Sequence, residues 1–316
     1  MKRIALKLIE TILKIGGRKY ILISQYQYDR LVNAFLNLSK LSNDNGEKEL
    51  SSIVFSKDRA MQLYAFLRSY AAKIKHKSPI VILYTTSNEA HEASYNNLKT
   101  IFKEDDVTFI KETDFRKQLL EILEQATVKK VLFFVDDMIL THDFDFDTLK
   151  HVNTTDSIVC LSCGKDLTYS TNLKQTLELP VFQTVDGMLR FKWNDIKILS
   201  NWSYPLGLSG YMFGRKEILA ILSTLTFKAP NSLEDSMQTF KPLFMNRFGL
   251  CTNHTIAVCV HANMVQTEGY NPVLGTFSVE ELLTLWNENK QIDISLFFDK
   301  PAGDTQIQKY AFIDRD

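Results

Sequence analysis

SSIVFSKDRAMQLYAFLRSY (residues 51–70) begins a stretch in which short apolar strands alternate with helices. The stretch ends with VLFFVDDMIL (residues 131–140). Strands are predicted at Ile53–Ser56, Ile80–Tyr84, Val107–Ile110 and Val131–Val135, with apolar residues at helical spacing between them. Strands that are apolar on both faces and alternate with helices indicate a parallel sheet. A fifth strand is predicted at Ser157–Ser162, and beyond Leu173 the pattern becomes irregular. The sequence therefore predicts a Rossmann-like α/β fold.

Residues 1–48 differ in pattern from this stretch. Residues 2–19 carry apolar side chains at helical spacing, flanked by six basic residues and a single acid, and residues 28–38 show a second helical pattern. The polar run SNDNGEKE (42–49) then reads as a linker. We expect a short helical N-terminal appendage and linker over residues 1–48, followed by one domain over residues 49–316. A basic amphipathic helix at residues 2–19 favours reversible docking on an anionic membrane surface, although packing on the domain or on a second copy also fits the pattern.

Composition limits the class of protein. The 37 basic and 37 acidic residues give a formal net charge of zero, which disfavours a nucleic-acid partner. No secretory signal or apolar run of membrane-spanning length is visible, so we expect a cytoplasmic protein, either free or docked peripherally on the cytoplasmic face of the membrane. The cysteines are Cys160, Cys163, Cys251 and Cys259. Cys160 and Cys163 are expected on opposite faces of a strand, which favours reduced core cysteines over half a zinc site.

Polar side chains gather where the predicted strands end, and ligands of open parallel sheets bind at that edge. Asp136 and Asp137 follow a wholly apolar strand, where two adjacent carboxylates are costly unless they are capped, paired or bound to a cation. Mg²⁺ or Mn²⁺ would connect such a pair to a diphosphate. The alternative is that one Asp caps a turn while the other is solvated.

The order of these elements, with an acidic pair about 80 residues after the first strand, resembles that of GT-A glycosyltransferases. The two quoted segments look like those of bacterial family-2-like nucleotide-sugar transferases, and the resemblance covers about residues 51–265. It implies a GT-A nucleotide-diphospho-sugar transferase fold with a mostly parallel central sheet. The nucleotide-binding half would be about residues 51–165 and the acceptor half about residues 166–316. Val135 stands where a strict Asp-x-Asp signature has its first Asp, a departure that bears on the metal site.

The resemblance also assigns roles to the residues at the strand ends. The metal ligand is Asp137, and the donor-binding residues are Ser56, Lys57, Asp58, Arg59, Thr85, Asp114 and Asp136.

Three segments of the second half complete the expected site. NWSYPLGLSGYMFGR (201–215) offers Trp202, Tyr204 and Tyr211 for stacking on sugar in the acceptor region, unless they simply fill the core. In APNSLEDSMQ (229–238), Glu234 and Asp235 are the catalytic candidates. In similar enzymes the Asp of such a pair is usually the general base. Alternatively, Ser232 caps a helix whose N-terminal dipole attracts both acids. His261, which follows another apolar strand, is the second metal-ligand candidate, or else a structural histidine.

The expected function is transfer of a sugar from a nucleotide-diphosphate sugar to a hydroxyl of a glycan or lipid-linked acceptor. The predicted enzyme is an inverting hexosyltransferase acting in cell-surface polysaccharide synthesis. The alternative is a non-catalytic GT-A-like protein that binds glycan or scaffolds an assembly. P-loop and dinucleotide-binding motifs are absent from the sequence, which disfavours an NTPase or an oxidoreductase.

Overall fold

The computed structural model describes residues 23–41, 48–196, 198–263, 265, 275, 277–307 and 309–315. Residues 2–19, the predicted membrane-docking helix, lie outside these ranges. The largest sheet contains, in spatial order, β11 (Gln183–Val185), β12 (Met188–Lys192), β14 (Phe248–Thr252), β8 (Ser157–Gly164), β13 (Tyr211–Gly214), β5 (Val128–Val135), β1 (Lys48–Lys57), β3 (Ile80–Thr85) and β4 (Val107–Lys111).

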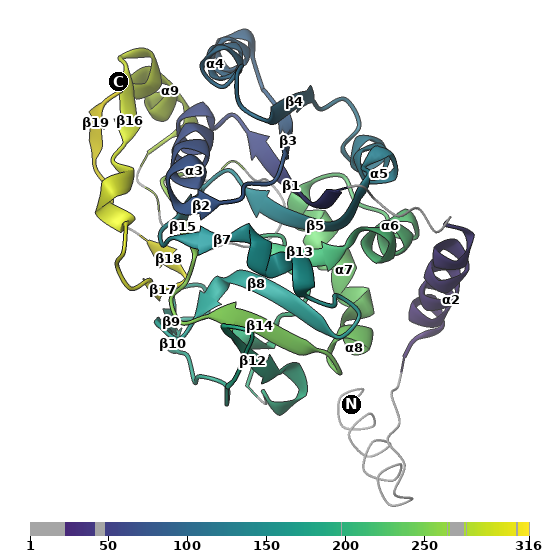
Figure 1. The fold of residues 1–316 in the computed structure, drawn as a ribbon. Coiled ribbons are helices and arrows are strands. Elements are labelled where there is room, and N and C mark those ends of the chain that lie inside the picture. Colours follow the sequence, from purple (N-terminus) through teal and green to yellow (C-terminus); the bar gives the residue numbers. More distant parts are fainter. Residues whose placement is uncertain are drawn as a thin grey trace, which may run out of the picture.

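Helices cover both faces of this sheet. They are α2 (Gln25–Lys40), α3 (Ala60–Lys73), α4 (Glu89–Ile101), α5 (Phe115–Gln125), α6 (Arg215–Ser223), α7 (Pro230–Met237), α8 (Lys241–Phe244) and α9 (Val279–Asn287). Figure 1 shows α3 and α9 to one side of the sheet, and α5, α6 and α2 to the other. Short 3₁₀ turns are η1 (Phe146–His151), η2 (Trp193–Asp195), η3 (Asn201–Ser203), η4 (Gln238–Phe240) and η5 (Ile294–Phe297).

Four smaller sheets complete the fold. One consists of β10 (Gln175–Thr176), β9 (Leu167–Ser170) and β17 (Gly303–Asp304), and another of β18 (Gln306–Ile307), β15 (Ala257–Val260) and β6 (Met138–Leu140). Two pairs join β16 (Lys290–Ile292) to β19 (Phe312–Asp314), and β2 (Ile74–Lys75) to β7 (Phe144–Asp145).

The strands predicted from residues 51–140 form a parallel block. β1 lies between β3 and β5, parallel to both, and β4 extends the block beyond β3. The side chains of Asn88 and Asp114 cap α4 and α5. Because α3, α4 and α5 return the chain after β1, β3 and β4, and the four strands are parallel, the carboxyl ends of β1, β3, β4 and β5 meet at one edge.

The sheet as a whole is mixed, so the prediction of a mostly parallel sheet is not confirmed. β13 runs antiparallel to both β5 and β8, and β12 runs antiparallel to β14 and β11. Only β14 and β8 are parallel in this half. Loops and 3₁₀ turns precede β13 along the chain, so no crossover helix sets its direction. The irregular pattern beyond Leu173 did not reveal this reversal.

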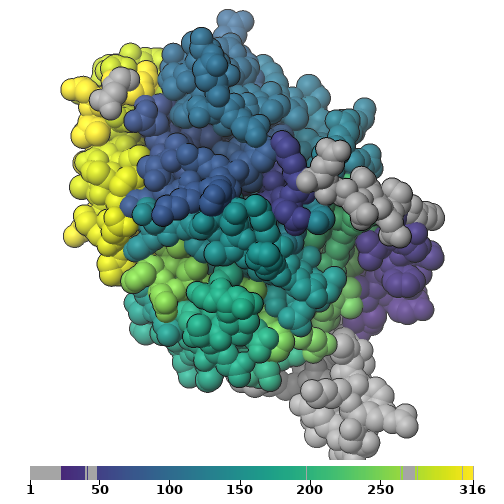
Figure 2. All heavy atoms as spheres, in the orientation of Figure 1, coloured from purple at the N-terminus to yellow at the C-terminus, as the bar shows by residue number. Residues whose placement is uncertain are grey.

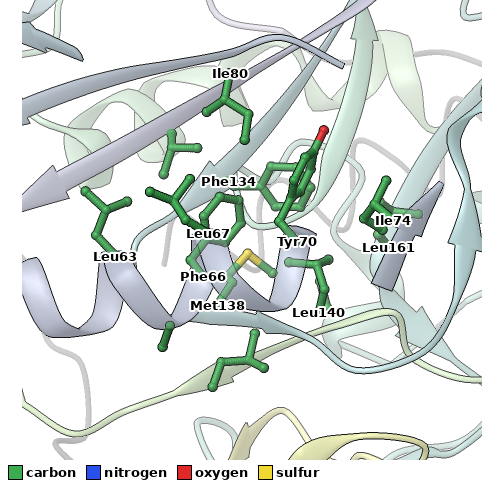
Figure 3. Close-up of a cluster of buried hydrophobic side chains, with 14 of the residues drawn as sticks. Leu63, Phe66, Leu67, Tyr70, Ile74, Ile80, Phe134, Met138, Leu140 and Leu161 are labelled. Carbon is green, nitrogen blue, oxygen red and sulfur yellow. The ribbon is translucent and has the colours of Figure 1, made fainter. Parts of the chain in front are cut away.

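Alternate residues of the central strands fill two separate cores. Val54 and Phe134 face the cluster beneath α3, whereas Phe55 and Phe133 face the cluster beneath α5 and α6. Figure 3 shows Phe134 and Met138 against the apolar face of α3. The two cores hold the parallel block rigidly and so fix the positions of the loops that follow its strands.

The helix α2 packs on α6 at the side of the molecule (Figures 1 and 2). Ala34 is buried there, and the Asn37 amide donates a hydrogen bond to Ser223 Oγ at 2.9 Å. The Arg30 guanidinium donates to the carbonyl oxygen of Thr224. The described part of the N-terminal region is thus attached to α6, while a boundary at residue 48 stays a prediction.

The Cys160–Cys163 segment corrects one expectation. The two Sγ atoms lie 3.0 Å apart, so these side chains do not point to opposite faces of β8. The pairing of β8 with β14 slips here, because Val159 faces Leu250 whereas Gly164 faces Thr252. The extra residues of β8 form an irregular bulge that breaks the alternation of its side chains. All four cysteines are free thiols.

Candidate active site

A cleft of about 840 Å³ opens at the carboxyl ends of the parallel strands. Its walls come from the loops after β1, β3, β4 and β5 on one side, and from segments around residues 199–211, 228–234 and 255–265 on the other. Predicted site residues that line it are Ser56, Lys57, Arg59, Thr85, Asp136, Asp137, Tyr204, Tyr211, Glu234 and His261. Ten of the predicted site residues, from distant parts of the sequence, therefore face a single space.

The acidic pair is held by a buried arginine. Arg59 Nη1 lies 3.0 Å from Asp136 Oδ1 and 3.0 Å from Asp137 Oδ2, and all three residues are buried. Ser56 Oγ and the Lys57 backbone N–H donate to the other oxygen of Asp136, at 2.9 and 3.1 Å. Both carboxylate oxygens of Asp136 are thus bonded by residues at the end of β1 and just after it, which connects β1 to the end of β5.

Arg59 also reaches across the cleft to the segment that follows β15. Its Nε donates to Asn263 Oδ1 at 2.9 Å, and its Nη2 donates to the Asn263 carbonyl oxygen at 2.6 Å. Gln62 Nε2 donates to the same Asn263 Oδ1 at 3.0 Å. Asn263 was missed from the sequence, because nothing in its local context distinguishes it from an ordinary loop asparagine. Only the contact with Arg59, 204 residues away, reveals its role.

Electrostatics in this network follow from burial. Burial raises the pKa of Asp136 to about 6, while Arg59 opposes that rise and the charge of Asp137 adds to it. Burial by itself would lower the pKa of Arg59, but the two carboxylates outweigh this effect and raise it. Two carboxylates share one guanidinium, so the cluster retains the capacity to accept a further positive charge.

Asp137 carries the oxygen that is available for a cation. Its Oδ1 is buried and has no hydrogen-bond partner among the described residues, whereas its Oδ2 is paired with Arg59. The backbone N–H of Val260 donates to the Asp137 carbonyl oxygen at 2.8 Å, which brings the end of β15, and hence His261, alongside the pair. A carboxylate oxygen and an imidazole in a cleft are suitable donors for Mn²⁺, and an oxygen donor suits Mg²⁺.

A separate cluster has a more compact set of metal-ligating atoms. Among the described residues, His76, Asp145 and Asp147 form the one group of three whose ligand atoms all lie within 4.8 Å of one another. None of these three residues lines the cleft. His76 follows β2 and the two aspartates lie at β7 and η1, at the end of α3 remote from Arg59. This cluster is therefore distinct from the acidic pair at Asp136 and Asp137.

The Glu-Asp pair on α7 divides into an inward and an outward residue. Glu234 lines the cleft, where its Oε2 accepts from the Leu208 N–H at 2.9 Å and its carboxylate accepts from the Tyr204 hydroxyl. Burial raises the pKa of Glu234, although these two hydrogen bonds oppose the rise. Asp235 is exposed and does not line the cleft in the described structure. The geometry thus selects Glu234, and not Asp235, as the candidate base.

Helix periodicity explains this reversal. Adjacent residues on a helix differ in direction by about 100°, so the two side chains point different ways, and of this pair it is Glu234 that lines the cleft. The alternative based on the helix terminus needs correction too. Ser232 is the third residue of α7 and not its cap, and its Oγ accepts from the backbone N–H of Ala229 at 3.1 Å.

The three aromatic candidates differ in whether they line the cleft. Tyr204 and Tyr211 line the cleft, and the Tyr211 hydroxyl donates to the Tyr204 carbonyl oxygen at 2.9 Å. Trp202 has no exposed surface and packs edge-on against Phe182 and Phe191. Trp202 is therefore a core residue in this structure, and its predicted role in stacking on sugar is not supported.

Two predicted donor-binding residues serve the loops instead of the cleft. Asp58 Oδ1 accepts from the Ser87 backbone N–H at 2.7 Å, and Asp58 itself has a φ of 53° in the left-handed region. Asp114 caps α5 by accepting from the Lys117 N–H at 2.9 Å. Neither lines the cleft of the described structure, so both would act through the shape of the strand-end loops. In contrast, Glu112 lines the cleft and was not predicted.

The comparison with known sequences bears on this cleft. The chain is 26% identical over 281 residues to the bifunctional glycosyltransferase pgtA of Dictyostelium discoideum, an alignment that covers 78% of this chain and 36% of that protein. The chain is thus a sequence relative of a glycosyltransferase. It spans about a third of the length of this curated relative. No family model matches the chain.

Solved structures give weaker likenesses. TarS of S. aureus, in complex with UDP-GlcNAc, has a TM-score of 0.43 and 14% identity, covering 71% of this chain and 60% of TarS. The mannosyltransferase PcManGT of Pyrobaculum calidifontis, in complex with GDP-Man and Mn²⁺, has a TM-score of 0.40 and 13% identity, covering 78% of this chain and 68% of PcManGT.

Proposed function

We propose that the chain transfers a sugar from a nucleotide-diphosphate sugar to a hydroxyl of an acceptor. One observation carries this proposal: the buried pair Asp136 and Asp137 and the separate, half-buried carboxylate of Glu234 face the same cleft at the carboxyl edge of a parallel block. Sugar transfer needs both features, a site for a diphosphate leaving group and a base for the attacking hydroxyl. The sequence relationship to a glycosyltransferase supports the same conclusion.

In this proposal the donor lies along the ends of β1, β3 and β5. Ser56, Lys57, Arg59 and Thr85 would surround the nucleotide, with Asp136 keeping the loop after β1 in place. Asp137, through its unpartnered Oδ1, and His261 would hold Mg²⁺ or Mn²⁺ together with diphosphate oxygens. Such an ion supplies positive charge that stabilises the departing diphosphate.

Glu234 is the proposed general base. Its carboxylate would accept the proton of the acceptor hydroxyl as the oxygen attacks the anomeric carbon. The Leu208 N–H and the Tyr204 hydroxyl hold the carboxylate in one orientation. Direct attack on the face opposite to the leaving diphosphate inverts the anomeric configuration. We therefore propose an inverting hexosyltransferase, with Tyr204 and Tyr211 beside the acceptor.

The acceptor is proposed to be a glycan or a lipid-linked intermediate of cell-surface polysaccharide synthesis, modified at the cytoplasmic face of a membrane. Residues 2–19 are basic and apolar at helical spacing, and the neighbouring helix α2 exposes Tyr28, Val32, Phe35 and Leu36. No helix among the described residues has the length and apolar character needed to cross a membrane. Anionic liposomes should sediment the protein at low salt and release it at high salt. Equal recovery in the supernatant with and without liposomes would contradict membrane docking.

Hydrolysis of UDP-, GDP-, dTDP- and CMP-sugars, measured with and without Mn²⁺, tests the function itself. At least one donor should be cleaved and should raise the melting temperature by mass action. Asp137→Asn should abolish the Mn²⁺-dependent part of both effects while the circular dichroism spectrum stays unchanged. Binding of glycan without cleavage or binding of any donor would instead support the non-catalytic alternative.

A further inference from the structure

The edge of the cleft at the ends of β1 and β4 carries two opposite charges, those of Lys57 and Glu112. Glu112 directly follows β4, and its backbone N–H donates to the Tyr84 carbonyl oxygen at 2.7 Å, which fixes it against β3. Lys57 ends β1. The side chains of both residues line the cleft, as do Thr85, Thr86 and Ser87 between them.

Neither charged group forms an ion pair or a side-chain hydrogen bond within the described structure. No hydrogen bond or ion pair is found there for the Glu112 carboxylate or for the Lys57 ammonium group. Burial raises the pKa of Glu112, Lys57 opposes that rise, and Asp114 adds to it. The carboxylate is therefore half-buried, feels the nearby ammonium group, and still has both oxygens available to a ligand.

The position of this pair follows from the order of the strands. The acidic pair follows β5, and Glu112 follows β4, three strand intervals away through β1 and β3. At about 4.8 Å per interval this separation is about 14 Å. If a diphosphate lies at Asp137 and the sugar points towards Glu234, the nucleoside extends the other way, along β1 and β3. Its base then reaches Lys57 and Glu112.

We propose that Glu112 and Lys57 read the Watson–Crick edge of a guanine, so that the donor is a GDP-sugar; this inference rests on the proposed function. Guanine presents one acceptor, O6, beside two donors, N1–H and the N2 amino group. An ammonium group suits O6, and the two oxygens of a carboxylate suit the two donors. Uracil offers only N3–H, with an acceptor on each side, so one carboxylate oxygen would face a carbonyl oxygen. Adenine and cytosine each place a ring acceptor beside their amino group.

Isothermal titration of the whole chain with GDP, IDP, UDP, ADP and CDP, each with Mn²⁺, tests this inference. IDP is the matched ligand, because it differs from GDP only in lacking the N2 amino group. GDP should bind at least about tenfold more tightly than IDP and UDP, as expected for a charged hydrogen bond. Glu112→Gln should weaken GDP binding about tenfold and leave UDP binding within about twofold, because a Gln amide places a donor against a donor.

The control variant is Glu104→Gln, since Glu104 is exposed beyond α4 and should keep the nucleotide preference of the unmodified chain. Binding of UDP as tight as that of GDP would overturn the guanine inference while the proposed function stands. An unchanged preference in Glu112→Gln would remove Glu112 from base recognition and likewise overturn it. If none of the five nucleotides binds, the proposed function fails together with this inference.

Discussion

Removal of Arg59 should destabilise the fold strongly, because its guanidinium is the shared counter-ion of two buried carboxylates. Asp136 is 3% exposed and Asp137 is 7% exposed, and each lies 3.0 Å from Arg59 Nη1. Removal of one partner of a buried ion pair costs about 3–5 kcal/mol, since the other charge stays buried without compensation. We therefore consider Arg59→Met, which retains much of the aliphatic stem and removes the charge.

Proton uptake limits this loss. Asp136 has a pKa of about 6, so placing a proton on it at pH 8 costs about 3 kcal/mol. Because Arg59 lowers the pKa of Asp136, the variant raises that pKa further and makes protonation easier. The expected loss of unfolding free energy for Arg59→Met at pH 8 is therefore about 3 kcal/mol.

The loss should shrink in acid. Since the pKa of Asp136 is higher in the folded chain than its ordinary value of 3.8, the folded state binds this proton more tightly than the unfolded state does. Its contribution to stability is fully present below pH 3.8 and is lost as the pH rises through about 6. In Arg59→Met the same loss occurs at higher pH, so the difference from the unmodified chain is larger at pH 8 than at pH 5.

Urea unfolding followed by circular dichroism and by fluorescence of the buried Trp193, Trp202 and Trp286 measures this effect. Arg68→Met is the matched control, because Arg68 lies on α3, the helix that Arg59 precedes as its N-cap residue, but is exposed. The control should lose less than about 0.5 kcal/mol. The double variant Arg59→Met/Asp137→Asn should regain stability by removing one of the unpaired charges. Equal losses for Arg59→Met and Arg68→Met, or a loss that does not depend on pH, would refute the reasoning.

Further predictions concern the base and the domain boundary. Glu234→Gln should lower kcat at least about 100-fold with little change in donor KM. Asp235→Asn should leave kcat within about twofold of the unmodified chain. The opposite order would identify Asp235 as the base. The acid limb of the kcat/KM profile should lie above pH 4.5, because burial raises the pKa of Glu234 and only its ionised form accepts a proton; Glu234→Gln should flatten that limb. A chain that starts at residue 48 should fold and bind nucleotide, with about 1–2 kcal/mol less stability from the lost Asn37 and Arg30 hydrogen bonds. An insoluble product would show that α2 belongs to the core.

Local pattern was sufficient for the parallel block and for much of the cleft. Apolar runs such as Val131–Val135 predict strands wherever they occur, because burial on both faces demands apolar side chains at every position. Asp114, and the pair Ser87 and Asn88 of which Asn88 is the cap, mark the starts of two helices for an equally local reason, since a cap bonds to backbone only three residues away. Parallel strands that alternate with helices end at one edge, so the grouping of Ser56, Thr85 and Asp136 in one cleft also follows from the sequence.

The tertiary structure decided the directions of strands and side chains and the contacts between residues that are far apart in the sequence. The antiparallel entry of β13 and the bulge of β8 arise from loops and strand pairings that no local period encodes. A run of Glu-Asp does not reveal which residue faces inward; the packing of α7 against the cleft selects Glu234. Arg59 was predicted to contact a donor, but its partners Asp136, Asp137 and Asn263 lie 77, 78 and 204 residues away. Long-range pairs of this kind form only in the assembled fold, because a charge that is buried away from water is costly unless an opposite charge lies next to it.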